Sequence, residues 1–326
     1  MKKSISQVVG AGLTLLATLT GASVFAAEVR LGFVMTNAQN PAEVSMMEGF
    51  KQGAKAAGVE VTIISAKGSI ERMGNGVMDL IAQRVNGIAT ITMDSLGGKT
   101  WVDSANKAGI PYVSVAVQVG DPKTTPFKNV YPGLSAFVGQ DYISSGRRMA
   151  EAVVKRDLLP KGRTAKIGII EGQPGYALVN QLKEGFEAGL KGAGANYKIV
   201  MSQPTDWTPA KGQEVCANAL VANPDMDVFF SHAEDMAIGC AKAIQEAGSK
   251  AKLVTVAGGS KLGTPLIKSG AIAISMCEAW VNVGEQGAKA LLEAINNPST
   301  PKARLIEYKP ELIDASNTDK VCPPQW

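Results

Sequence analysis

The sequence contains only one histidine, His232, and none of the complete motifs that identify the common α/β enzymes. No Gly-x-Ser-x-Gly element is present, and no Gly-x-Gly-x-x-Gly follows the first expected strand. These absences argue against a serine hydrolase and a dinucleotide-binding enzyme. The run Gly97–Thr100 looks like the end of a phosphate-binding loop, but Met93 stands where that loop needs a glycine. We therefore expect a protein that is not an enzyme and that needs no cofactor.

A metal site is not expected either. His232 is followed closely by Glu234 and Asp235, and these three residues are the only grouping that suggests a metal. A single histidine beside the start of a helix is more typical of packing or hydrogen bonding than of metal ligation.

The sequence has one long apolar stretch, and it lies at the N-terminus. Residues 1–26 begin with two lysines after Met1, continue with an apolar run broken by Thr and Gly, and end in Val24-Phe25-Ala26. This pattern predicts a secretory signal peptide, cleaved after Ala26, and not a membrane span. No cysteine follows the cleavage site to carry a lipid anchor. We expect the mature protein to be a periplasmic monomer.

Neither sign of charge is in excess. The chain has 33 Lys and Arg residues against 29 Asp and Glu, a formal net charge of +4, and no dense basic run. Nucleic acid and membrane surfaces are therefore not expected partners. Hydrophobic residues make up 45% of the 326 residues, which is enough for the cores of two domains.

The four cysteines, Cys216, Cys240, Cys277 and Cys322, include no Cys-x-x-Cys pair, which argues against a thioredoxin-like or zinc-ribbon site. An even number in an oxidising compartment permits two disulfides, and three pairings are open. Cys216 and Cys240 lie in expected helices that flank one strand, whereas Cys322 lies in a proline-rich tail that needs anchoring. We predict the pairs Cys216–Cys240 and Cys277–Cys322.

Strand and helix patterns alternate along the chain with short turns between them. The first run of units has expected strands at 29–35, 60–65, 87–93 and 110–117 and helices at 41–57, 70–84 and 100–108. The second run has expected strands at 166–171, 197–202, 227–231, 252–257 and 271–276 and helices at 142–156, 178–190, 209–222, 235–247, 263–268 and 283–295. Two such runs predict an α/β fold with two doubly wound parallel sheets. Ligands bind beyond the carboxyl ends of the strands in such sheets.

Several segments resemble the ribose-type (type I) periplasmic sugar-binding proteins of ABC transporters. The matching segments are Asn40-Pro41, Ile110-Pro111, Glu184-Gly185-Phe186, Ser202–Trp207, Phe229–Gly239 and Gly284–Ala288. The resemblance implies two similar lobes joined by a hinge that the chain crosses three times. It places residues 28–139 and 279–308 in the first lobe, and residues 140–278 and 309–326 in the second. It also implies a small-molecule ligand between the lobes and a membrane permease as partner.

The resemblance, together with the positions after each strand, indicates which residues contact the ligand. Asn40 matches a ligand-bonding asparagine of the family, Trp207 replaces a cleft phenylalanine, and Glu278 stands at the position of a hinge glutamine. The full set of expected ligand-binding residues is Asn40, Glu43, Asp94, Tyr176, Asn180, Trp207, Glu234 and Glu278. Each has an alternative role: Glu43 fits a capping box with Asn40, and Asp94 and Asn180 fit helix caps. Trp280 is expected to pack.

The family's ribose pocket is not retained, because Ala116-Val117 replaces an Asp-Arg pair and Ala42 replaces an aromatic residue. A linear polyol or a modified sugar fits the remaining residues better than a pyranose. The surplus of carboxylates over arginines also allows an amine or a quaternary ammonium ligand. Two roles remain open: delivery of the ligand to an ABC importer, or presentation of it to a membrane sensor kinase.

Overall fold

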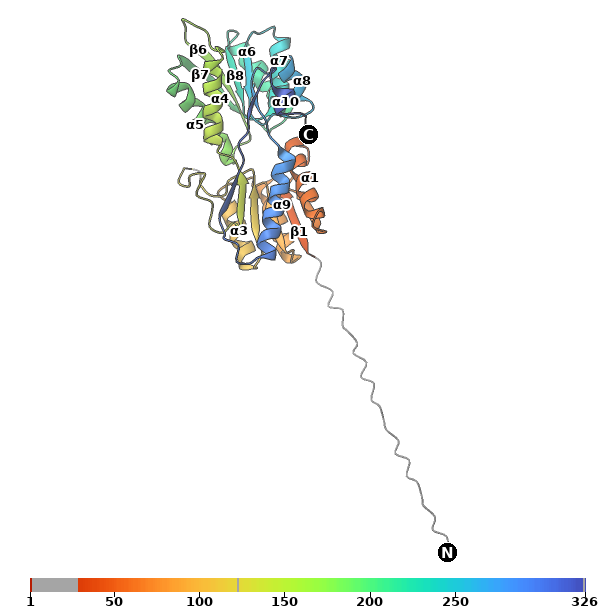
Figure 1. Cartoon of the computed structure of the whole chain (residues 1–326). Helices are drawn as coiled ribbons and strands as arrows, with labels where there is room; N and C mark the ends of the chain where they lie inside the picture. The colour runs from red at the N-terminus through yellow and green to blue at the C-terminus, as the bar shows by residue number, and fades with distance from the viewer. Residues whose placement is uncertain (2–28, 122, 325) are drawn as a thin grey trace.

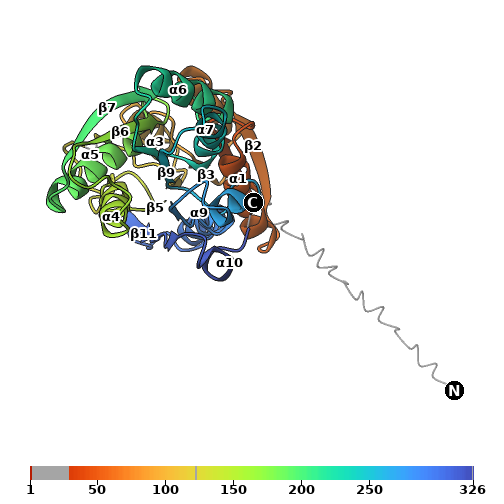
Figure 2. The same cartoon turned by 90° about the horizontal axis from the view of Figure 1, so that it is seen from above.

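The computed structural model describes residue 1 and residues 29–121, 123–324 and 326. The expected signal peptide, Met1 apart, lies outside the described residues. The described chain forms two lobes that are stacked end to end and meet at a narrow waist (Figure 1). Figure 2 looks along the long axis, and the two lobes overlie one another in that view.

The first lobe is built on a six-stranded sheet in which every neighbouring pair is parallel. Its order is β11-β5-β4-β3-β1-β2, with bounds β1 (Arg30–Met35), β2 (Glu60–Ser65), β3 (Gly87–Thr90), β4 (Tyr112–Val115), β5 (Ala136–Gly139) and β11 (Arg304–Glu307). The helices of this lobe are α1 (Pro41–Lys55), α2 (Ile70–Ala82), α3 (Gly98–Lys107) and α9 (Trp280–Asn296). The central strands read as continuous apolar runs because helices cover both faces of the sheet.

The second lobe has a four-stranded parallel sheet in the order β7-β6-β8-β9. Its bounds are β6 (Ala165–Glu171), β7 (Tyr197–Pro204), β8 (Val228–Ser231) and β9 (Lys252–Thr255). The short strand β10 (Ser275–Met276) pairs antiparallel with β12 (Leu312–Ile313). The helices are α4 (Tyr142–Lys155), α5 (Ala177–Gly192), α6 (Pro209–Ala222), α7 (Glu234–Glu246), α8 (Gly263–Lys268) and α10 (Thr318–Val321).

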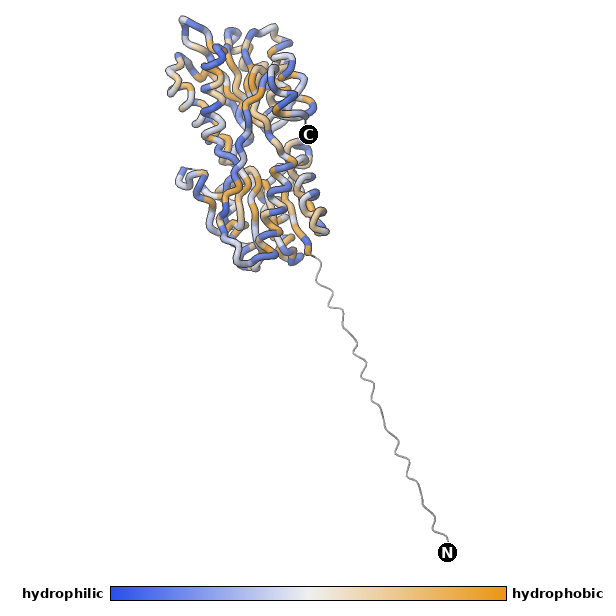
Figure 3. The backbone as a smooth tube through the Cα atoms, viewed as in Figure 1, coloured by the Kyte–Doolittle hydropathy of each residue, from blue (hydrophilic) through white to orange (hydrophobic). Residues whose placement is uncertain are grey.

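The two parallel sheets confirm the expected doubly wound α/β fold of two lobes. Hydrophobic residues are concentrated on the strands in the middle of each lobe, and the loops are more hydrophilic (Figure 3). The chain passes between the two sheets three times: from β5 to α4, from β10 to α9, and from β11 to β12. Among the described residues, no helix combines the length and the apolar character needed to cross a bilayer.

Both predicted disulfides are present. Cys216 of α6 is bonded to Cys240 of α7, with the two Cα atoms 5.2 Å apart. Cys277, in the second passage between the lobes, is bonded to Cys322, with a Cα separation of 5.6 Å. One bond therefore lies inside the apolar core of the second lobe, and the other lies at the waist.

Three pairs of helices make close backbone contacts through glycines: α1 with α9, α4 with α5, and α6 with α7. In the first pair, a Cβ atom on Gly49 would overlap the carbonyl oxygen of Val281, and one on Gly284 would overlap that of Met46. Each helix thus lacks a side chain where the other approaches. The contact fixes α9 against α1 at a separation that only glycine permits.

We expect Gly284→Ala to lower the free energy of unfolding by about 1–3 kcal/mol, because the added methyl group meets backbone and not a movable side chain. Gly192→Ala is the matched control, since Gly192 lies in helix α5 and a Cβ there meets nothing within 4 Å. The control should be neutral or stabilising by up to about 1 kcal/mol. Urea unfolding of both variants measures the difference, and equal stabilities would contradict the assigned contact.

Candidate functional site

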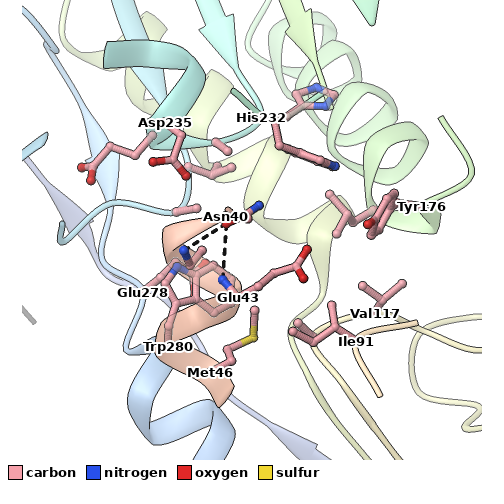
Figure 4. A pocket seen from close by; sticks show the side chains of 18 of the residues that line it. Asn40, Glu43, Met46, Ile91, Val117, Tyr176, His232, Asp235, Glu278 and Trp280 are labelled. Carbon is pink, nitrogen blue, oxygen red and sulfur yellow. Dashed lines mark hydrogen bonds between the residues drawn. The ribbon is translucent and has the colours of Figure 1, made fainter. Parts of the chain in front are cut away.

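A cavity of about 80 Å³ lies between the lobes and is lined by residues from both of them (Figure 4). The first lobe contributes Asn40 at the start of α1, Ile91 after β3, and Trp280 at the start of α9. The second lobe contributes His232 after β8 and Ala257 after β9. The cavity is therefore at the carboxyl ends of both parallel sheets, as expected for this fold.

Four carboxylic acids line this cavity, and no lysine or arginine does. Glu43 is 4% exposed, Glu234 0%, Asp235 5% and Glu278 0%. Buried carboxylates need hydrogen bonds or opposite charges. Backbone N–H groups and side-chain amides supply most of the partners in this site.

Glu43 is held by the loop that joins β1 to α1. Its Oε2 accepts hydrogen bonds from the backbone N–H groups of Thr36, at 2.8 Å, and Asn37, at 3.0 Å. The Thr36 hydroxyl donates to Oε1. Burial raises the pKa of Glu43 to about 7. The carboxylate does not form the expected capping box, because it does not reach the N–H of Asn40, which donates to the Asn37 carbonyl.

Asn40 caps helix α1 with its own side chain. Its Oδ1 accepts from the N–H groups of Ala42, at 3.0 Å, and Glu43, at 3.3 Å (Figure 4). Pro41 follows at the first helical position, which needs no N–H donor. The cap leaves the Asn40 side chain at the cavity wall.

Glu234 and Asp235 occupy the first turn of α7. Glu234 accepts from the backbone N–H of Gly259, at 3.3 Å, and of Ser260, at 3.0 Å, and burial raises its pKa to about 7. Asp235 has no hydrogen bond to the described residues, and burial raises its pKa to about 6. Asp235 is thus a buried hydrogen-bond acceptor that lines the cavity and has no partner among the described residues.

Glu278 joins two of the three passages between the lobes. Its Oε1 accepts from Nε2 of Gln140 at 2.5 Å, and Oε1 of Gln140 accepts from the hydroxyl of Ser145 at 2.8 Å. Burial raises the pKa of Glu278 to about 8. The Tyr142 hydroxyl donates to the Ala116 carbonyl at 3.1 Å and ties the start of α4 to the first lobe.

Polar atoms that are buried and have no hydrogen-bond partner among the described residues gather at this cavity. They are Tyr176 Oη, His232 Nε2, Glu278 Oε2, Trp280 Nε1 and Trp326 Nε1. Buried polar groups are almost always hydrogen-bonded in folded proteins. The residues that carry these atoms all line one cavity, which makes it the candidate site for a polar ligand.

The protonation of His232 follows from its surroundings. The N–H of Gly172 donates to Nδ1 of His232 at 3.4 Å, which assigns the ring proton to Nε2. Burial lowers the pKa of His232 to about 3, so the ring is neutral at physiological pH. His232 is therefore a neutral ring that lines the cavity, and its buried Nε2–H has no partner among the described residues.

Aromatic rings and a strained backbone complete the walls. The rings of Tyr176 and Trp207 lie edge to face, with centroids 5.5 Å apart at an angle of 84°. Trp207, Ala116 and Ala257 have left-handed backbone angles, with φ of 67°, 63° and 61°, and all three line the cavity. Non-glycine residues in this region are uncommon and cluster at functional sites.

Of the eight residues expected to bind ligand, six line the cavity: Asn40, Glu43, Tyr176, Trp207, Glu234 and Glu278. Asp94 does not line it, because its Oδ1 accepts from the N–H of Leu96 in a local turn. Asn180 does not line it either, because it lies on an exposed position of α5.

Sequence reasoning did not select His232, Asp235, Gln140, Trp280 or Trp326 as ligand contacts. His232 and Asp235 lie directly after strand β8. This position after a parallel strand is the sequence feature by which they could have been identified. Trp280 packs in the core of the first lobe, as expected, with its ring edge to face against Tyr308, and it also lines the cavity. Trp326 is far from the other lining residues in the sequence, and no local pattern marks it.

These features agree with the comparisons with known proteins. The profile of the family described as periplasmic binding protein domain matches residues 31–299. The chain belongs to this family of binding proteins.

Individual relatives cover nearly the whole chain. The D-allose-binding periplasmic protein of Escherichia coli is 27% identical over 306 residues, which is 93% of this chain and 95% of that protein. The ribose import binding protein of Bacillus subtilis is 27% identical over 84% of each chain. A crystal structure from Mycobacterium smegmatis in complex with β-D-fucofuranose has a TM-score of 0.80 and 25% identity, covering 89% of this chain and 93% of that one.

The lining acids make the stability of the protein depend on pH. The pKa of Glu278 is raised from 4.5 to about 8. Between those pH values the folded state keeps a proton that the unfolded state has released, so the free energy of unfolding falls as pH rises. The fall is at most about 1.4 kcal/mol per pH unit for one group. His232 has the opposite effect below about pH 6.5, because its pKa is lowered.

We therefore expect the free energy of unfolding to fall from pH 6.5 to 8, and Glu278→Gln to reduce the slope. Glutamine can still accept from Gln140 but carries no titrating proton. Urea unfolding at several pH values measures the slopes. Glu184→Gln, at an exposed glutamate of α5, is the control and should leave the slope unchanged. Equal slopes in wild type and Glu278→Gln would contradict the prediction.

Proposed function

We propose that this protein is a periplasmic solute-binding protein that captures a small polyhydroxyl ligand, a sugar or a sugar alcohol, between its lobes and delivers it to an ABC importer. The observation that carries the proposal is the set of five unpartnered buried polar atoms at one interlobe cavity. The names of the relatives, which include ribose- and D-allose-binding proteins, support the same ligand class.

The chemistry of the wall fits hydroxyl groups. His232, Trp280 and Trp326 offer N–H donors, while Glu278 and Asp235 offer acceptor oxygens. A hydroxyl can accept from one of these groups and donate to another, so a polyol matches a wall that mixes donors and acceptors. Trp207 adds an apolar ring for the C–H side of such a ligand. The volume of about 80 Å³ suits a small ligand, since drug-sized pockets have roughly 300–1,000 Å³.

The arrangement of the chain supports a closing motion. The lobes are joined by three passages, and residues of two passages, Gln140 and Glu278, are hydrogen-bonded to one another. We propose that these passages act as a hinge around which the lobes close on the ligand. In this proposal the protein works as a monomer, reaches the periplasm through the signal peptide in residues 1–26, and docks on a membrane permease.

A ligand that binds only the folded protein raises its melting temperature. At 100 times Kd the gain is about 2.7 kcal/mol, or roughly 5 °C for a chain of this size. We expect at least one of D-ribose, D-allose, D-arabinose, myo-inositol and glycerol to produce such a shift in a thermal unfolding screen. Trp207→Ala should abolish most of the shift.

Trp101→Ala is the matched control for Trp207→Ala. Trp101 lies on α3, packs beside Gly74 and does not line the cavity. Its removal should lower the melting temperature of the ligand-free protein and leave the ligand-induced shift intact. If Trp207→Ala unfolds the ligand-free protein and Trp101→Ala alone reduces the shift, the site has been placed wrongly.

A second ligand class is favoured by one observation, the four lining carboxylic acids without any lysine or arginine. Such a wall also suits an amine or a quaternary ammonium ion. Glu278→Gln separates the two classes. Above pH 8, where Glu278 is ionised, a cationic ligand such as ethanolamine or choline should lose about 2 kcal/mol or more of binding free energy with the charge. A neutral polyol should lose much less, as titration calorimetry of both variants would measure.

A further inference from the structure

Trp326 is held by the second lobe at the cavity between the lobes. Its backbone oxygen accepts from the N–H of Lys261 at 2.7 Å. Its side chain packs against a hydrophobic cluster that contains residues of both lobes, and it also lines the cavity. Figures 1 and 2 both place this end of the described chain beside α1.

The indole nitrogen of Trp326 is buried and has no partner among the described residues. Trp280, at the start of α9, has a second unpartnered indole nitrogen at the same cavity. Two tryptophans from distant parts of the sequence thus line one cavity, and each has a buried indole N–H without a partner among the described residues. A buried donor of this kind costs free energy unless a ligand group accepts from it.

The disulfide between Cys277 and Cys322 lies directly behind Trp326. Cys277 precedes the cavity residue Glu278 in sequence, and Cys322 precedes Trp326 by four residues and is 0% exposed. A Cβ on Gly259 would lie 2.9 Å from Sγ of Cys322 and 3.7 Å from Nε1 of Trp326. The sulfur and the indole nitrogen therefore lie near one another, on the same side of Gly259.

We propose that Trp326 contacts the ligand as part of the cavity wall and that the Cys277–Cys322 disulfide holds Trp326 in position. The proposal rests on the function proposed above and adds to it a specific residue and a covalent support. In the absence of this bond, the Lys261 hydrogen bond and the four-residue helix α10 are left to hold the segment that carries Trp326. These are weak restraints on a large side chain, so affinity should depend on the redox state of one cysteine pair.

The second disulfide provides a matched control within the same lobe. Cys216 and Cys240 are both 0% exposed, join α6 to α7, and do not line the cavity. Either bond restricts the unfolded chain, because the pairs are separated by 24 and 45 residues. Loss of either bond should lower the melting temperature, but only loss of Cys277–Cys322 should weaken ligand binding.

The experiment compares the mature protein with C277S/C322S, C216S/C240S, W326A and W101A. Titration calorimetry with D-ribose, D-allose and myo-inositol measures Kd. C277S/C322S and W326A should raise Kd at least tenfold, whereas C216S/C240S and W101A should leave it within about twofold. Unchanged Kd in W326A, or an equal rise of Kd in both disulfide variants, would overturn the proposal.

A second measurement does not depend on any ligand. Proteins labelled with 5-fluorotryptophan give a ¹⁹F resonance for each tryptophan, and W326A identifies that of Trp326. The Trp326 resonance should shift in C277S/C322S and stay in place in C216S/C240S. If it stays in place in both, the disulfide does not position the ring and the proposal fails. If no probe binds the wild type, the polyhydroxyl function fails separately, and the resonance alone decides whether the disulfide positions Trp326.

Discussion

The backbone contact between α1 and α9 is the constraint on which the site depends. Gly49 and Gly284 let the two helices touch without intervening side chains. Helix α1 begins beside the cavity and carries Asn40 and Glu43 into its wall, while α9 begins there with Trp280. Because both helices start at the cavity and are locked together, the first lobe presents one rigid half of the site. A change in the spacing of the two helices would move Asn40 and Glu43 relative to Trp280.

The electrostatics of the cavity rest on backbone dipoles more than on side-chain cations. Helices α1 and α7 both begin at the cavity with acids in their first turns. A helix start carries a partial positive charge that favours such acids. Backbone N–H groups bind Glu43 and Glu234 directly. Glu43 and Glu234 are therefore compensated before a ligand arrives, whereas Asp235 and one oxygen of Glu278 have no partner among the described residues.

The sequence was informative about everything that depends on local periodicity. The long βα units, both parallel sheets and the residues after β1 and β8 follow from apolar runs and helix caps. Strands β5 and β11 were not anticipated, because they pair with one another from distant parts of the chain and no local pattern encodes that pairing. Trp326 was missed for a similar reason: a disulfide and tertiary packing, which no local pattern encodes, bring it to the cavity. Asn180 shows the reverse, since its match to a family position did not decide which way its side chain faces, and it is exposed on α5.

The distribution of tryptophan has a practical consequence. The chain has four tryptophans, and three of them, Trp207, Trp280 and Trp326, line the cavity. Two of these sit on opposite lobes, so a change in lobe separation alters the surroundings of most of the indole rings in the molecule at once. The intrinsic fluorescence of the unlabelled protein is thus dominated by the cavity. A ligand that enters the cavity would therefore change the intrinsic fluorescence of this solute-binding protein, and a fluorimeter could follow binding without any added label.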